Sequence, residues 1–334
     1  MTEFSIILPI YNTPAEYFRA CVASIQAQHY ADCEVLLIDD GSTNGVGTLC
    51  DELTAQDSRF RVFHQANGGV SAARNTGLRA ACGQWLICLD PDDWWEPDLL
   101  ESAHARLTQH PVDLLIFSYC TETDGIRTDF SMGLPEPFQI GGELLHDLQL
   151  GLLDEPHRVV KTYIGGPCYQ FVRRELVTKY QIYFDTALRQ SEDALWDMNL
   201  LEQAGSAALL DKVFYHYRIY NASNSHRYDS TYPQLVEQIN QRFRAFGEEH
   251  QKNADYWPLI GSGLLKNTSS CSRFISSTQT RPKPTARLGG SGSSFSAPAP
   301  AFRQSESFLF RNFTGLGKFT RFSTFFSSGY HPTL

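Results

Sequence analysis

Three acidic residues close together carry the strongest chemical signal in the sequence. Asp90, Asp92 and Asp93 lie in the segment Asp90-Pro91-Asp92-Asp93. Two like charges about 4 Å apart repel by on the order of 4 kcal/mol at an effective dielectric constant of 20. A divalent cation would relieve this repulsion, and carboxylate oxygens suit Mg²⁺ or Mn²⁺ while leaving coordination positions for a substrate phosphate. A helix-capping role is the alternative for Asp93, but it does not explain Asp90.

Two other polar segments follow apolar runs in the same way. They are Pro9-Ile10-Tyr11-Asn12 and Asp39-Asp40-Gly41-Ser42. Open α/β sheets bind ligands at the carboxyl ends of their strands, so the three segments are expected to converge in one crevice. Taken alone, residues 39–42 are more typical of an ordinary strand-to-helix turn.

The elements that would position these segments alternate along the first 118 residues. Short apolar runs, typical of strands buried on both faces, occupy residues 4–8, 34–38, 60–63 and 85–89. Helices are predicted over 14–28, with a capping box at Thr13–Glu16, and over 71–81 and 97–109. The βαβαβαβ order predicts an α/β fold with a mostly parallel sheet.

The later sequence is less regular. A strand is predicted over 112–118, an irregular region over 119–160, a helix over 192–203, a strand over 208–217 and a largely polar helix over 239–249. From about residue 270 the composition turns to Ser, Phe, Gly and Pro, which is typical of a tail. This tail holds eight Lys or Arg residues and one Glu, whereas residues 1–269 hold 20 basic and 36 acidic residues.

Composition excludes several classes of protein. The acidic body disfavours nucleic-acid binding, because it would repel a phosphate backbone. Neither GxGxxG nor GxxxxGK[ST] is present, so dinucleotide-dependent oxidoreductases and P-loop NTPases are not supported. The eight Cys residues form no CxxC pair and are expected to be free, mostly buried thiols. No leader or membrane-spanning run is apparent, which predicts a cytoplasmic protein.

Five segments in order resemble the family 2 glycosyltransferases. They are SIILPIYN at 5–12, EVLLIDDGST at 34–43, NGGVSAARNTGL at 67–78, WLICLDPDDWWEPDLL at 85–100 and SEDALW at 191–196. The resemblance covers about residues 1–225. It implies the Rossmann-like GT-A fold and an inverting enzyme that uses a nucleotide-diphosphate sugar and Mn²⁺ or Mg²⁺.

The resemblance also implies a role for each matching residue. Asp193 would be the general base that deprotonates the acceptor hydroxyl, with Glu192 beside it orienting the loop, and Asp92 would ligate the metal. The base pocket would involve Pro9, Tyr11 and Asp39, with Asp39 accepting from uracil N3–H. The remaining nucleotide-sugar contacts would come from Asn12, Asn67, Arg74, Asp90 and Arg218. Without the resemblance, Glu192-Asp193 would be read as an exposed helix start.

Two positions depart from the common family pattern. Ser191 stands where many members have Gly, and Cys168-Tyr169-Gln170 replaces a Trp/Lys-type segment, which leaves acceptor recognition open. His216, near Arg218, is a further candidate for phosphate contact, against an ordinary strand end.

The predicted function is transfer of a hexose or N-acetylhexosamine from a UDP-sugar to a glycan or lipid-linked acceptor, in lipopolysaccharide or capsule biosynthesis. The alternatives are a non-catalytic sugar-nucleotide or glycan-binding protein and a metal-dependent phosphohydrolase or nucleotidyltransferase. The predicted domains are a glycosyltransferase domain over 1–225, divided at residue 118 into a nucleotide-sugar-binding half and an acceptor-side half, and a helical extension over 226–269. The basic, Phe-rich tail over 270–334 is either disordered, docked on the cytoplasmic face of the inner membrane, or the product of a shifted reading frame.

Overall fold

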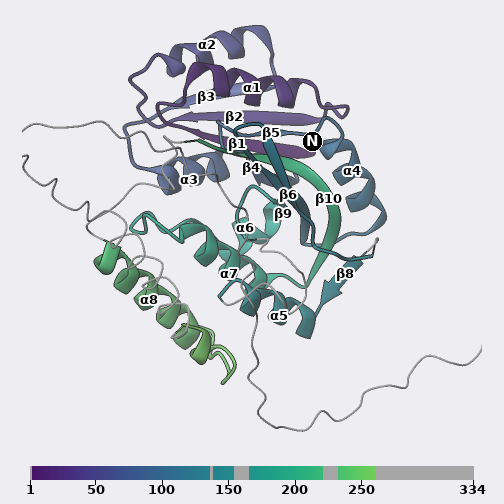
Figure 1. Cartoon of the computed structure of the whole chain (residues 1–334), viewed down its shortest axis with the longest axis vertical. Coiled ribbons are helices and arrows are strands. Elements are labelled where there is room, and N and C mark those ends of the chain that lie inside the picture. The colour runs from purple at the N-terminus through teal and green to yellow at the C-terminus, as the bar shows by residue number, and fades with distance from the viewer. Residues whose placement is uncertain (1, 136–137, 154–164, 221–231, 261–334) are drawn as a thin grey trace, which may run out of the picture. The chain divides into compact units, whose positions relative to one another are not determined.

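The computed structural model describes residues 2–135, 138–153, 165–220 and 232–260 (Figure 1). The chain divides into two units, Met1–Thr280 and Arg281–Leu334, and every described residue lies in the first. The predicted tail over 270–334 lies outside the described residues. No helix within the described ranges is both long and apolar enough to cross a membrane.

Four parallel strands form the first part of the sheet. They are β1 (Phe4–Ile10), β2 (Cys33–Asp39), β3 (Phe60–His64) and β4 (Trp85–Cys88), in the spatial order β3-β2-β1-β4. Every residue of β1, β2 and β4 is buried, as expected for strands covered on both faces. The order reverses at β1, and such a switch point opens a crevice at the carboxyl ends of the strands. The predicted α/β fold with a parallel core is therefore confirmed.

Helices cover both faces of these strands. They are α1 (Ala15–Gln26), α2 (Val46–Gln56), α3 (Val70–Ala80) and α4 (Leu99–Gln109). Figure 1 shows α1 and α2 on one side of β1 to β3 and α3 on the other. Helix α3 approaches β1 closely because Gly77 has no Cβ, which would overlap the Ile7 side chain. The predicted capping box of α1 is wrong, since Pro14 occupies the N-cap and no side chain caps the helix.

The second part of the sheet mixes strand directions. It contains β5 (Trp94–Trp95), β6 (Leu114–Thr123), β7 (Ile126–Phe130), β8 (Phe138–Gly141), β9 (Gln170–Arg173) and β10 (Ser206–Ile219). Only the β6–β10 pair among them is parallel. The prediction that residues 119–160 are irregular is wrong where the structure describes them: β6 continues to Thr123 and turns into β7, and β8 and a helix follow.

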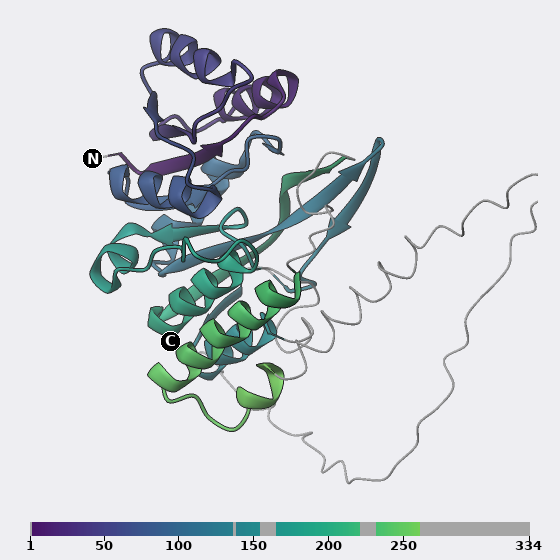
Figure 2. The same cartoon turned by 90° about the vertical axis from the view of Figure 1, so that its left-hand side faces the viewer.

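The remaining helices gather on the second part of the sheet. They are α5 (Glu143–Gly151), α6 (Arg174–Tyr180), α7 (Glu192–Gln203) and α8 (Tyr232–Glu249). Phe243 and Phe246 of α8 pack with Leu150 of α5 and Met198 of α7 in a second hydrophobic core, and Figure 2 shows these helices side by side. The region predicted as a helical extension therefore rests on the first 225 residues through an apolar face.

The described cysteines are all free, and all but Cys82 are buried. This confirms the thiol prediction for seven positions. Cys271 lies outside the described residues.

Candidate active site

A buried guanidinium joins the end of β4 to the start of α7. Arg74 lies on α3, and its Nη2 atom donates to Asp90 Oδ1 at 3.1 Å while Nη1 donates to Glu192 Oε1 at 3.2 Å. The ring of Phe184 lies 5.4 Å from the guanidinium carbon. Burial alone would lower the pKa of Arg74, but Asp90 and Glu192 outweigh burial and raise it. Three residues predicted from separate motifs, up to 118 positions apart, are thus directly connected.

The other two acids of the β4 segment are held by tyrosines. Tyr220 donates its hydroxyl to Asp92 Oδ2 at 3.0 Å, and Tyr215 donates to Asp93 Oδ2. Asp93 also accepts the Arg218 backbone N–H at 2.7 Å, so it does not cap a helix. Burial and the neighbouring carboxylates raise the pKa of Asp92 and of Asp93. These hydrogen bonds therefore offset part of the repulsion expected from the sequence, but the ionised forms of Asp92 and Asp93 remain disfavoured.

Arg218 and His216 serve different neighbours. The Arg218 guanidinium lies 4.4 Å from the Tyr17 ring centre and 4.5 Å from that of Trp94, and its Nε donates to the Asp92 carbonyl at 2.9 Å. Arg218 thus borders the acidic segment, and its contact with a phosphate stays a prediction. His216 instead places its ring nitrogens against two other carboxylates, described below.

The carboxylate of Asp39 is enclosed by protein groups. Ser42 N–H donates to Oδ1 at 3.0 Å, and His64 Nδ1 lies 2.8 Å from Oδ2. Burial would raise the pKa of Asp39, but the hydrogen bonds from Ser42 and His64 outweigh burial and lower it. Any uracil contact would have to share these oxygens.

Asp40 organises the loop before α3 and was not among the predicted site residues. Its Oδ1 accepts from Gln65 Nε2 at 2.7 Å and from Gly68 N–H at 2.9 Å, and its Oδ2 accepts from Gly69 N–H at 2.8 Å. Gly69, the N-cap of α3, has φ of 87°, which favours glycine. Two sequence features could have indicated the role of Asp40: the adjacent acids at 39–40 and the Gly68-Gly69 pair.

Several predicted nucleotide-contacting residues also have structural roles. Asn12 has φ of 50° and accepts the Thr43 N–H at 2.8 Å, which ties the loop after β1 to the loop after β2. Asn67 donates to the Asp40 carbonyl at 3.0 Å. Pro9 is buried within β1, whereas Tyr11 is 53% exposed and presents an aromatic face beside these loops.

The predicted base lies at the first turn of α7. Asp193 is half-buried and accepts the Ala194 N–H at 2.7 Å, at a helix end where a carboxylate is stabilised. Ser191, the N-cap, has φ of 58°, which explains on steric grounds why glycine suits this position. Burial raises the pKa of the adjacent Glu192, and Asp193 adds to the rise.

Asp197, one turn further along α7, is a buried acid that the motifs did not indicate. It accepts hydrogen bonds from Gly166 N–H and Gln170 Nε2, and burial raises its pKa to about 8. Asp197 therefore attaches α7 to residues 166–170, the segment in which the sequence departs from the family pattern.

A comparison with known protein families identifies the family of this chain. A family model described as "Glycosyl transferase family 2" matches residues 5–177, which is more than half of the chain. The chain belongs to glycosyl transferase family 2. The predicted glycosyltransferase activity is thereby confirmed, and a phosphohydrolase or nucleotidyltransferase is no longer a competing interpretation.

Relatives in this family share moderate identity. EpsH of Bacillus subtilis, named as a glycosyltransferase, is 26% identical over 275 residues, which cover 80% of this chain and 75% of EpsH. The glycosyltransferase GlyG of Streptococcus pneumoniae is 38% identical over 124 residues, which cover 36% of this chain and 41% of GlyG.

Solved structures show the same fold. S. aureus TarS 1–349 in complex with UDP-GlcNAc has a TM-score of 0.66 at 22% identity and covers 83% of this chain and 76% of its own. The mannosyltransferase PcManGT of Pyrobaculum calidifontis, in complex with GDP-Man and Mn²⁺, has a TM-score of 0.52 at 16% identity, with 84% of this chain and 76% of its own covered. The GT-A prediction is confirmed.

The charges of this family 2 site fit a divalent cation. Carboxyl groups outnumber guanidinium groups around the end of β4, and a divalent ion would offset the excess negative charge. The carboxyl groups include those of Asp90, Asp92, Asp93 and Glu192, and the guanidinium groups are those of Arg74 and Arg218. Asp92 is the predicted ligand, and oxygens of a diphosphate and water would complete the coordination shell.

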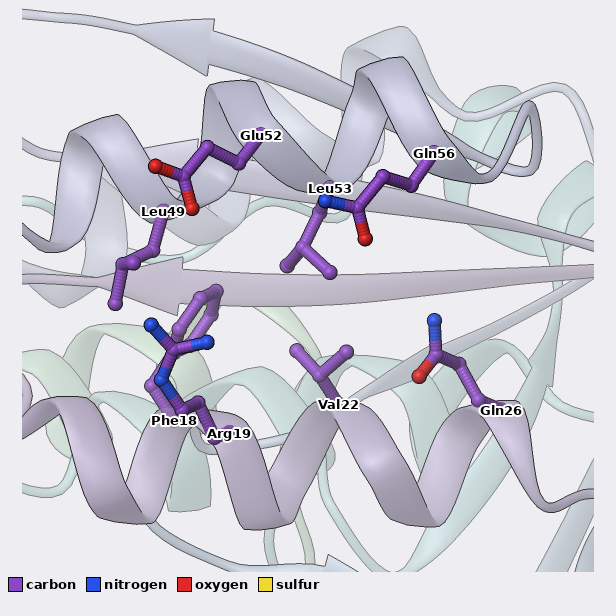
Figure 3. A pocket seen from close by; sticks show the side chains of 8 residues that line it. All are labelled: Phe18, Arg19, Val22, Gln26, Leu49, Glu52, Leu53 and Gln56. Carbon is purple, nitrogen blue, oxygen red and sulfur yellow. The ribbon is translucent and has the colours of Figure 1, made fainter.

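A separate hollow lies between α1 and α2, on another part of the surface. It is lined by apolar side chains including Phe18, Val22 and Leu53, with Arg19 and Glu52 on opposite sides (Figure 3). Its volume of about 230 Å³ is below that of most small-molecule sites. None of the predicted site residues lines it.

Proposed function

We propose that the chain is an inverting transferase that moves a hexose or N-acetylhexosamine from a UDP-sugar to a hydroxyl group of a glycan or lipid-linked acceptor. The observation that carries this proposal is the Arg74 bridge between Asp90 and Glu192, which joins the donor-binding acids to the loop of the proposed base. Lipopolysaccharide or capsule biosynthesis is the proposed setting. The UDP-GlcNAc bound by TarS supports a UDP-sugar donor.

The base end of the donor would lie at the loops after β1 and β2. Tyr11 offers an exposed ring face, and aromatic rings stack on bases without regard to their identity. Asp39, ionised because Ser42 and His64 lower its pKa, offers the acceptor that would read uracil N3–H. Asn12 and Asn67 would hold these two loops in place.

The diphosphate end would lie at the end of β4. A Mn²⁺ or Mg²⁺ ion bound at Asp92 would neutralise charge on the leaving diphosphate. Arg74 orients Asp90 toward the ribose and sugar through its hydrogen bond to Asp90 Oδ1. Arg218, held between Tyr17 and Trp94, brings a second positive charge to this edge.

The acceptor side would be served by α7. Asp193 removes the proton from the attacking hydroxyl, while Glu192, anchored by Arg74, fixes the first turn of the helix. A positioned general base contributes typically 10²–10⁴-fold to rate. We place the protein in the cytoplasm, with the basic, Phe-rich tail touching the membrane surface that presents a lipid-linked acceptor.

A donor panel tests the proposal. The full chain is incubated with UDP-, GDP- and dTDP-sugars in Mn²⁺ or in EDTA, and release of nucleoside diphosphate is measured with and without glycan acceptors. We expect release of UDP from a UDP-hexose or UDP-N-acetylhexosamine in Mn²⁺ but not in EDTA. GDP bound as tightly as UDP would contradict uracil recognition.

The Asp193→Asn variant separates catalysis from binding. Asparagine keeps the shape but cannot take the proton, so transfer should fall by about 10²–10⁴-fold while UDP affinity is retained. Asp124→Asn is the matched control, because Asp124 lies on an exposed turn with φ of 50°, a conformation that Asn tolerates. Full transfer activity of Asp193→Asn would show that another residue is the base. An equal loss of transfer activity in Asp193→Asn and Asp124→Asn would indicate a non-specific effect.

A further inference from the structure

A thiol, an imidazole and a carboxylate meet on one face of the sheet, away from Asp92. Cys120 and Glu122 are alternate residues of β6, and His216 of β10 pairs in register with Cys120. Because successive side chains of a strand point to opposite faces, His216 points away from Tyr215 and its partner Asp93. This group therefore lies across the sheet from the buried part of the acidic segment.

The three ligand atoms are spaced as they would be around one metal ion. Cys120 Sγ lies 3.3 Å from His216 Nδ1, which lies 3.2 Å from Glu122 Oε1, and all three atoms lie within 4.8 Å of one another. Tetrahedral zinc, with bonds of about 2.0–2.3 Å to nitrogen, oxygen and sulfur, places neighbouring ligand atoms roughly 3.3–3.6 Å apart.

The other nitrogen of the same imidazole is already oriented. His216 Nε2 lies 2.9 Å from Glu96 Oε1, and the Trp94 ring stacks on the imidazole at 4.8 Å. A carboxylate that accepts the far N–H of a histidine fixes the tautomer whose remaining nitrogen binds metal. Glu96 thus presents Nδ1 as the ligand atom.

We infer that Cys120, Glu122 and His216 form a second metal site, selective for Zn²⁺ or a similar transition-metal ion. Thiolate and imidazole ligands favour such ions over Mg²⁺ or Mn²⁺, the ions proposed for Asp92. A protein molecule would therefore hold two different metals. Water would fill the fourth position.

The site would stabilise one wall of the donor site. Trp94 stacks on His216 on one side and contacts Arg218 at 4.5 Å, and Arg218 donates to the Asp92 carbonyl. A metal that holds His216 would also hold this chain of contacts. The structural role of the zinc is therefore distinct from the donor metal's role.

The alternative is that Cys120, Glu122 and His216 form a hydrogen-bonded group that binds no metal. Without a metal, the His216 ring nitrogens hydrogen-bond with Glu96 and Glu122, while Arg127 pairs with Asp129 at 2.6 Å and Glu96 at 3.5 Å. In that case Cys120, whose pKa is raised to about 11 by burial, would remain a thiol and the group would have no affinity for metal. Direct metal binding separates the two arrangements.

The test uses the full chain, stripped of metal with EDTA and titrated with Zn²⁺ against a chromophoric chelator, and with Co²⁺ in an absorption spectrometer. We expect one tight Zn²⁺ equivalent and a thiolate-to-Co²⁺ charge-transfer band. Cys120→Ser should remove the band and weaken Zn²⁺ binding by at least about 100-fold, and Glu96→Gln should weaken it by about 10–100-fold.

Matched variants make the result decisive. Cys82→Ser removes the exposed thiol and should leave the band intact, and Asp92→Asn should also leave it intact. If Cys120→Ser does not fold, Glu122→Gln, at a half-buried position, must weaken Zn²⁺ binding. The inference is overturned if wild type binds no stoichiometric Zn²⁺, if Cys120→Ser or folded Glu122→Gln binds as wild type does, or if Asp92→Asn abolishes the band.

Discussion

The acidic segments after β2 and after β4 face the same crevice but are built in opposite ways. After β2, Asp39 and Asp40 accept hydrogen bonds from backbone N–H groups of Ser42, Gly68 and Gly69. The pKa of Asp39 is lowered, because the hydrogen bonds from Ser42 and His64 outweigh burial. Folding therefore stabilises the charged carboxylate without any ligand.

After β4 the balance is reversed. Asp93 is buried and Asp92 is half-buried, both lie close to Asp90, and the pKa values of Asp92 and Asp93 are raised. The tyrosine hydroxyls of Tyr215 and Tyr220 only partly compensate. The carboxylates after β2 are thus stabilised by the protein's own hydrogen bonds, whereas the carboxylates after β4 carry unfavourable charge that a cation would stabilise.

The largest expected effect comes from the segment after β4. Asp92→Asn should abolish Mn²⁺-dependent transfer and weaken UDP binding by about 100-fold in Mn²⁺, because a ligand and a charge are lost. Binding in EDTA should change little. Isothermal titration with UDP in the two buffers measures both, and equal affinity of variant and wild type in Mn²⁺ would contradict the metal assignment.

The same substitution in the two segments should change stability in opposite directions. Asp40→Asn places an NH₂ group against a backbone donor of the α3 loop and should destabilise by about 1–3 kcal/mol. Asp92→Asn removes like-charge repulsion and should stabilise the metal-free protein. Urea unfolding in EDTA checks both signs, and a loss of stability in both variants would refute the contrast.

The partner of Asp92 should set the pH range of metal binding. Tyr220→Phe keeps the ring against Tyr17, at 5.0 Å, but removes the hydroxyl that lowers the Asp92 pKa. The Asp92 pKa then rises further, so protons compete with Mn²⁺ at higher pH. The acidic limb of Mn²⁺-dependent UDP affinity should shift upward by less than about one pH unit; no shift, or a shift downward, would contradict this.

The last prediction concerns Asp197, which lies in neither of the two segments. Its pKa of about 8 lies far above the ordinary value of about 3.9. The folded state therefore keeps a proton that the unfolded state releases, so stability falls as pH rises from about 4 to about 8 and levels off above that. Asp197→Asn has no proton to lose, and Gln170 can rotate its amide oxygen to accept from the new NH₂ group.

Thermal unfolding between pH 5 and 9 measures this difference. The variant should gain Tm relative to wild type as pH rises from 5 to 8, because each pH unit costs the wild type about 1.4 kcal/mol and each kcal/mol corresponds to about 2–4 °C. A difference that is constant with pH would show that Asp197 is charged throughout.

Local sequence patterns predicted the first half of the fold well. Continuous apolar strands such as Phe4–Ile10 are buried on both faces, and the amphipathic helix Ala15–Gln26 lies close to its predicted bounds. Residues 119–153 were predicted poorly because β7 is largely exposed and β8 is short. Such strands carry no alternation of their own and depend on pairing with β6 and β10.

Motifs also indicated most of the candidate site, but not how its members are connected. Asp90, Asp92 and Glu192-Asp193 stand out in the sequence. Tyr220, which binds Asp92 from 128 residues away, carries no local signal. Asp197 carries no local signal either, because an acidic residue within a predicted helix is common.

The amino-acid sequence by itself determined which strands are buried, where the loops that carry acids occur, and which family the motifs resemble, because these depend on residues near each other in the chain. Only the tertiary structure decided which carboxylates are stabilised by hydrogen bonds and which remain in unfavourable surroundings. Burial and neighbouring polar or charged groups set a carboxyl pKa, and both arise from residues such as Arg74 and Tyr220 that are brought in from distant positions. The same long-range packing alone reveals the group of Cys120, Glu122 and His216.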